Sequence, residues 1–191
     1  MFNAYGLYKK ARNAAWQALI DNKISSLPVD VVKIANDNGI SILKNSEANE
    51  LRDGEVGVSL YDGDEWFVIY DDTVRSIGRK RFTIAHELGH IFLGHPLIAG
   101  YHKRSVDLNI PSTENEANIF ASRLLAPACV LWGLNLHTAE EIAVACNISM
   151  SAATNRAERM EELYRRNKFL TSPLEKEVYN QFRDFIEKSR P

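Results

Sequence analysis

Apolar residues recur at helical spacing along most of the chain, which predicts a mainly helical protein. In residues 7–21, leucine and alanine return every three or four positions, and the many alanines favour a helix. A shorter apolar stripe at residues 31–35 ends at Asn38-Gly39, a sequence typical of a helix C-terminus. The same spacing predicts further helices over residues 75–93, 112–125, 130–134, 138–146, 149–168 and 173–188.

Three short segments have a strand pattern instead. Residues 40–43 are largely apolar and β-branched, and apolar residues alternate with other types over 56–60. A turn signal at Asp62-Gly63 separates this run from the aromatic and β-branched run 65–70, so the two runs are expected to form a β-hairpin. The sequence therefore predicts an α+β fold that is mainly helical, with a small, mostly antiparallel sheet above a central helix and a helical C-terminal subdomain.

Length and composition indicate a folded protein of ordinary type. The chain has 191 residues, of which 45% are hydrophobic and 25% are charged, so there is enough apolar material for a core. We expect one principal domain over residues 1–130, which holds the strands and the motif described below, and a helical subdomain over residues 131–191.

Charge and cysteine content exclude several classes of protein. The 23 lysines and arginines against 25 acidic residues give a net charge of −2, which supplies no overall field for a phosphate backbone or an anionic membrane. Cys129 and Cys146 are too few for a disulfide framework, and their apolar neighbours predict buried free thiols. The sequence has no apolar signal segment near Met1 and no apolar stretch of membrane-spanning length, so we expect a cytoplasmic protein without a membrane partner.

The sequence His86-Glu87-Leu88-Gly89-His90 is an H-E-x-x-H motif inside a predicted helix. On that helix His90 lies about 40° and Glu87 about 100° from His86, while the opposite face is apolar. Two imidazoles one turn apart provide two of the three protein ligands of a catalytic zinc, and Glu87 is in place to act as general base on a bound water. A chance pair of surface histidines is the alternative, which the apolar opposite face argues against.

Two glutamates compete for the place of the third ligand. Glu114 and Glu116 lie at the start of the next predicted helix, on the two sides of its apolar stripe. Thr113 followed by Glu116 is also a capping-box sequence, in which Glu116 closes the first helical turn. The helical geometry does not choose between the two residues.

Two blocks of sequence resemble the ImmA/IrrE family of metallopeptidases. The first reads R-F-T-I-A-H-E-L-G-H over 81–90, and the second reads E-A-N-I-F-A-S-R-L-L-A-P over 116–127, with Ala126 in place of the usual methionine. The resemblance implies a zincin-like active-site helix and a gluzincin-like centre with one zinc per chain. The implied metal ligands are His86, His90 and Glu116, and the implied catalytic base is Glu87.

The resemblance also implies a function. Members of the family cleave or inactivate a helix-turn-helix transcriptional repressor of a phage, mobile element or stress locus, so we expect a zinc-dependent endopeptidase that acts as an anti-repressor. The alternative is a non-catalytic regulatory protein that sequesters a repressor or binds DNA through residues 138–168, which read as a helix-turn-helix. Acidic residues among Arg156 and Arg159 argue against DNA as the partner.

Two further features bear on substrate binding. The hairpin over 56–70 has two possible roles, which are compatible: it exposes an edge strand that an extended peptide can join through main-chain hydrogen bonds, or it covers the core. Donors for the oxyanion that forms during hydrolysis are sought among the following residues: His95, Tyr101, His102 and His137.

Overall fold

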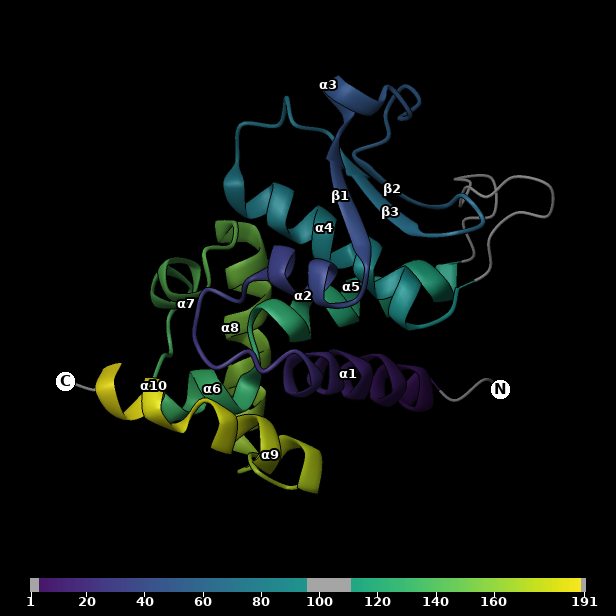
Figure 1. Cartoon of the computed structure of the whole chain (residues 1–191). Coiled ribbons are helices and arrows are strands. Elements are labelled where there is room, and N and C mark those ends of the chain that lie inside the picture. Colours follow the sequence, from purple (N-terminus) through teal and green to yellow (C-terminus); the bar gives the residue numbers. More distant parts are fainter. Residues whose placement is uncertain (1–3, 96–110, 190–191) are drawn as a thin grey trace.

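Helices make up most of the chain in the computed structural model, which describes residues 4–95 and 111–189 (Figure 1). The helices are α1 (Ala4–Asp21), α2 (Val31–Asp37), α3 (Asn45–Ala48), α4 (Ile77–Phe92), α5 (Pro111–Leu125), α6 (Ala128–Gly133), α7 (Ala139–Cys146), α8 (Met150–Arg165), α9 (Pro173–Gln181) and α10 (Arg183–Ser189). The strands are β1 (Ile40–Lys44), β2 (Gly57–Tyr61) and β3 (Trp66–Tyr70). The expected α+β, mainly helical class is confirmed. None of the described helices has both the length and the apolar character to cross a membrane.

The three strands form one mixed sheet in the order β1-β3-β2. β2 and β3 pair antiparallel as the expected hairpin, with Val58 opposite Ile69. β1 pairs with the other edge of β3 in parallel, so the sheet has one pair of each kind rather than being mostly antiparallel. The hairpin already occupies one edge of β3, and the segment that contains α3 carries the chain across to that edge after β1. β2 is therefore left as an edge strand.

Helix α4 lies between the sheet and α5, as expected for the helix that carries the motif (Figure 1). It begins after Ser76, whose hydroxyl accepts a hydrogen bond from the Arg79 N–H. Gly89 allows α5 to approach closely, because a Cβ at this position would lie 3.1 Å from the ring of Phe120. Helix α4 is thus held on both sides, which fixes the direction of its side chains.

The C-terminal helices pack onto the rest of the described chain. α9 contacts α1 and α6, and the Gln181 side chain donates hydrogen bonds to the carbonyls of Leu19 and Ile24, each at 2.7 Å. Helix α7 begins with a capping box, with Thr138 and Glu141 as its two members. The division of the chain at residue 130 stays a prediction.

Two elements differ from the sequence-based expectation. The short helix α3 lies in a segment expected to be a loop, and the helix expected over 173–188 is broken at Phe182 into α9 and α10. Val178, Phe182 and Ile186 are all buried, so the apolar period continues through the break and does not reveal it.

Both cysteine thiols are buried and free, as predicted. Burial raises the pKa of Cys129 and of Cys146 to about 12, so the thiolate is scarce at pH values near 8. We expect neither thiol to react with a colorimetric thiol reagent in the folded protein, and both to react after addition of denaturant. Rapid reaction of one thiol without denaturant would show that its surroundings open in the native state.

Candidate metal centre

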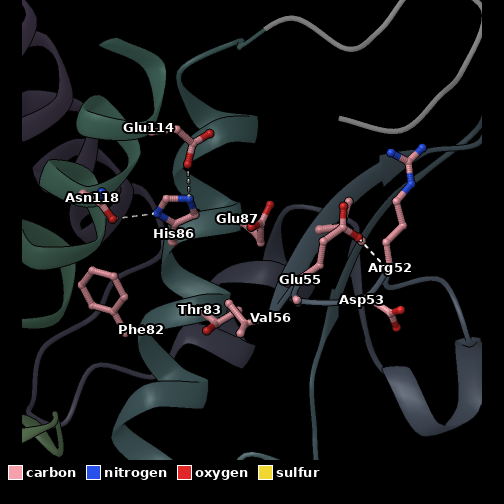
Figure 2. A pocket seen from close by; sticks show the side chains of 13 residues that line it. Arg52, Asp53, Glu55, Val56, Phe82, Thr83, His86, Glu87, Glu114 and Asn118 are labelled. Carbon is pink, nitrogen blue, oxygen red and sulfur yellow. Dashed lines mark hydrogen bonds and ion pairs between the residues drawn. The ribbon is translucent and has the colours of Figure 1, made fainter. Parts of the chain in front are cut away.

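Two histidine side chains of α4 meet a glutamate from the first turn of α5. The Nε2 atoms of His86 and His90 lie 3.0 Å apart. The Glu114 carboxylate lies 3.2 Å from Nε2 of His86 and 3.4 Å from Nε2 of His90. Figure 2 shows Glu114 above His86, with Asn118 and Glu87 on its two sides. The three residues form a group suited to a metal ion, with one ligand atom from each.

The spacing of these atoms is compact enough for one ion. Zinc bonds nitrogen and oxygen ligands at about 2.0–2.1 Å, which places neighbouring ligand atoms about 3.3 Å apart in a tetrahedron. The two Nε2 atoms lie close to this separation, at 3.0 Å, whereas the two contacts of Glu114 use different oxygens, and one ligand atom from each of the three residues lies within 4.8 Å of the others. Two neutral imidazoles and one carboxylate are also a ligand set found in catalytic zinc sites, which keep a fourth position open.

Glu116, the third ligand implied by the family resemblance, does not lie in this group. Glu114 and Glu116 are two positions apart, so their side chains leave α5 in directions that differ by about 200°. Glu114 points toward α4, and Glu116 lies on the other flank of the buried face of α5. Glu116 is buried there, with its carboxylate 3.5 Å from Nε2 of His95 and 3.6 Å from Nζ of Lys10. The geometry therefore favours Glu114 over Glu116 as the third ligand.

The outer nitrogens of both histidines have partners that orient the rings. Nδ1 of His86 lies 3.0 Å from the Asn118 carbonyl oxygen, and Nδ1 of His90 lies 2.8 Å from Nδ1 of His95. His95 in turn contacts Glu116. The buried carboxylate of Glu116 is therefore linked to the ligand His90 through the His95 ring. Partners of this kind fix the tautomer and raise the basicity of a ligand histidine. The sequence analysis did not assign Asn118 this role, although it is one helical turn from Glu114.

Glu87 lies beside the metal group in an open pocket of about 640 Å³. Its side chain is buried and faces β2, where a Cβ at Gly57 would lie 3.4 Å from its Oε1. The same Cβ would lie 2.4 Å from Cγ2 of Thr83, so only glycine lets β2 pass this close to α4. The pocket wall opposite His86 is formed by the chain that leads into β2, including Glu55 and Val56 (Figure 2).

Two of the candidates for an oxyanion donor lie in the described residues, and neither of them lines this pocket. His95 lies behind His90, and His137 stacks on Tyr164 with its Nε2 3.1 Å from the Asn135 side-chain oxygen. Tyr101 and His102 lie outside the described residues.

The helix-turn-helix reading of α7 and α8 leaves little for DNA to bind. Arg156 is fully buried, and Arg159 forms an ion pair with Glu162. The exposed face of α8 includes Glu158 and Glu161, which repel a phosphate backbone.

A comparison with protein families shows which family the chain belongs to. The family model of a peptidase group, described as the IrrE N-terminal-like domain, matches residues 35–158. The match contains the three strands, the metal group and Glu87, and it leaves α1, α9 and α10 outside. A search of curated proteins found no match.

Proposed function

The chain belongs to the peptidase family of the IrrE N-terminal-like domain, a metallopeptidase family, and we propose that it is a zinc-dependent endopeptidase. The observation that carries the proposal is the group of His86, His90 and Glu114, whose ligand atoms lie within 4.8 Å of one another, with Glu87 beside it in one open pocket. We assign the first three residues as metal ligands and Glu87 as the general base.

Each residue has a defined task in peptide hydrolysis. When bound, zinc supplies a Lewis acid that polarises the scissile carbonyl and lowers the pKa of a bound water. The Glu87 carboxylate accepts the proton of the attacking water and returns it to the leaving amine. Asn118 and His95 hold the two ligand imidazoles in a fixed orientation through their Nδ1 atoms.

The edge of the sheet supplies a place for an extended peptide. Val56, Gly57 and Val58 line the pocket together with His86 and Glu87, and β2 has no strand on its outer side among the described residues. A peptide that adds to this edge is held by main-chain hydrogen bonds that do not depend on its sequence. This arrangement supports an endopeptidase, which must hold substrate residues on both sides of the cleaved bond.

For the substrate, we propose a helix-turn-helix transcriptional repressor, as the resemblance to the ImmA/IrrE family implies. The protein is then an anti-repressor, and its partner is a folded protein. Purified repressors of this class are the probes, and the expected result is a defined pair of fragments rather than general degradation.

Metal removal tests the proposed activity without knowledge of the substrate. The protein is incubated with a complex peptide mixture, and new peptide ends are identified by mass spectrometry. We expect a zinc chelator to abolish the cleavage, and about one equivalent of zinc to restore it where magnesium does not, because the two imidazoles favour zinc. Cleavage that continues after complete removal of metal would contradict the proposal.

A further inference from the structure

Another pocket shares no lining residue with the one at the metal centre and lies among α1, α5 and α8, whose arrangement is drawn in Figure 1. Its volume is about 290 Å³, and we call it the basic pocket because six of its lining residues are cationic. They come from four regions of the chain and are Arg12, Arg123, Arg156, Arg159, Arg166 and Lys168. Such a concentration of positive charge is unexpected in a chain of net charge −2.

Three of the guanidinium groups converge on one tyrosine. The central carbons of Arg12, Arg123 and Arg159 lie 6.0, 5.5 and 5.7 Å from the ring centroid of Tyr8. Cation–π attraction stabilises each contact, but it does not cancel the charge. The arginines therefore repel one another in a partly buried setting.

The pKa values of two groups reflect this field. Burial alone would raise the pKa of Tyr8, yet Arg123, Arg159 and Arg156 together lower it. Burial, followed by the nearby Arg123, lowers the pKa of Arg156 to about 9. The charged form of Arg156 is therefore disfavoured by burial and by repulsion from Arg123, and a bound anion would reduce this unfavourable free energy.

Two carboxylates balance part of this charge. Glu175 is buried in the wall of the pocket, where it accepts a hydrogen bond from the Thr171 N–H at 2.9 Å. Glu162 forms ion pairs with Arg159 and Arg166 at the outer end of the pocket. Arg123 and Arg156 instead donate hydrogen bonds to neutral oxygens, the Ser122 hydroxyl at 2.7 Å and the Ala126 carbonyl at 2.8 Å.

Several hydrogen-bond donors of the pocket lack an acceptor. Nη2 of Arg156, a side chain that is 2% exposed, has no hydrogen-bond partner among the described residues. The same holds within the described chain for Nε of Arg123, Nε of Arg159 and Nε1 of Trp16. Buried donors are normally satisfied, so a group of four around one cavity indicates a missing acceptor.

We propose that the basic pocket binds a small phosphorylated anion. A planar guanidinium group donates two parallel hydrogen bonds to a pair of phosphate oxygens. Several guanidinium groups around one cavity favour a ligand with more than one negative charge. The volume of about 290 Å³ suits a phosphate or pyrophosphate group with a small substituent, and it is too small for a protein segment of any length. Arg123 and Arg156 lie within the matched family range, whereas Tyr8, Arg12, Arg159 and Lys168 lie outside it, so the pocket is built from both parts of the chain.

Calorimetric titration with inorganic phosphate, pyrophosphate and ATP tests the proposal. The His90→Ala variant is used beside the unaltered protein, because phosphates also bind zinc and binding at the metal centre must be removed. We expect saturable binding of one anion per chain in both proteins, tightest for pyrophosphate or ATP. Preference for ATP would identify a nucleotide, and preference for pyrophosphate would identify a smaller phosphate ester or anhydride.

Matched arginine variants locate the binding. Arg159→Gln and Arg123→Gln are expected to weaken binding about tenfold each, since each removes a charge-assisted hydrogen bond. Arg165→Gln, on the exposed side of the same helix α8, is expected to change it less than about twofold. Arg156→Met is measured as well where circular dichroism shows that it folds.

Four outcomes would overturn the proposal. The first is no saturable binding of any of the three probes at millimolar concentration. The second is equal weakening by Arg159→Gln and Arg165→Gln, which would indicate general charge screening. The third is loss of binding in His90→Ala, which would place the anion at the metal centre. Binding of duplex DNA without binding of the small phosphates would likewise replace the proposal with a nucleic-acid surface.

Discussion

Replacement of Glu87 by glutamine is expected to lower peptide cleavage by at least about 100-fold while the zinc content stays at one ion per chain. Glutamine keeps the size of the side chain but cannot accept the proton of the attacking water, and general base catalysis contributes about 100- to 10,000-fold. Glu87 is buried against β2, so the isosteric change avoids a new cavity or clash. Cleavage is measured with the peptide mixture, and zinc by elemental analysis of the same sample.

The matched control for this prediction is Glu158→Gln on the exposed face of α8, which is expected to retain full cleavage. Full activity of Glu87→Gln would exclude Glu87 as the base. If both the Glu87→Gln and the Glu158→Gln variant relieve repression in cells, and no cleavage is found, the protein is the regulatory binding protein given above as the alternative. Disruption of α7 and α8 would then abolish its effect.

The second large effect is expected at the third metal ligand. Glu114→Ala should lower zinc affinity by more than about 100-fold, because it removes a charged ligand, whereas partners behind a ligand contribute about 10- to 100-fold. Glu116→Ala should lower zinc affinity by about 10-fold, the low end of that range, since Glu116 contacts the metal group only through His95 and His90. Zinc affinity is measured by competition with a chromophoric chelator.

A larger loss of zinc affinity in Glu116→Ala than in Glu114→Ala would restore Glu116 as the third ligand, which is the assignment that the family resemblance implies. To separate metal affinity from folding, the unfolding of each metal-free variant is followed in denaturant. Glu116→Gln serves as a second variant, because it keeps the volume of a buried side chain and removes only its charge. An equal loss of zinc in Glu114→Ala and Glu116→Gln would contradict the arrangement described here.

The third ligand shows where sequence reasoning reaches its limit. The H-E-x-x-H motif fixes the geometry of His86 and His90 because both lie on one helix, one turn apart. Glu114 and Glu116 lie on a different helix, on opposite flanks of its apolar stripe, so the choice depends on which flank turns toward α4. The approach of Phe120 to Gly89 decides this rotation, and no local pattern encodes it.

The fold was predictable to a similar extent. Long periodic segments such as α1, α4 and α5 were expected nearly at their observed limits, and the hairpin was expected from its turn and its alternation. The four-residue helix α3 is too short to show a period, and the parallel pairing of β1 depends on a contact between distant segments. The basic pocket has no sequence signature at all, because its cations are spread over residues 12–168 and acidic residues elsewhere cancel their charge.

Gly57 has a consequence for genetic screens of this protein. Its backbone passes so close to α4 that even one added methyl group would press on Thr83 and reach Glu87. In a saturation mutagenesis experiment scored by cleavage, almost every substitution at this codon would therefore score as a loss of function while the metal ligands stayed intact. A position without any functional group would then rank beside the catalytic residue, and an intolerance map alone would misread a requirement for empty space as a requirement for chemistry.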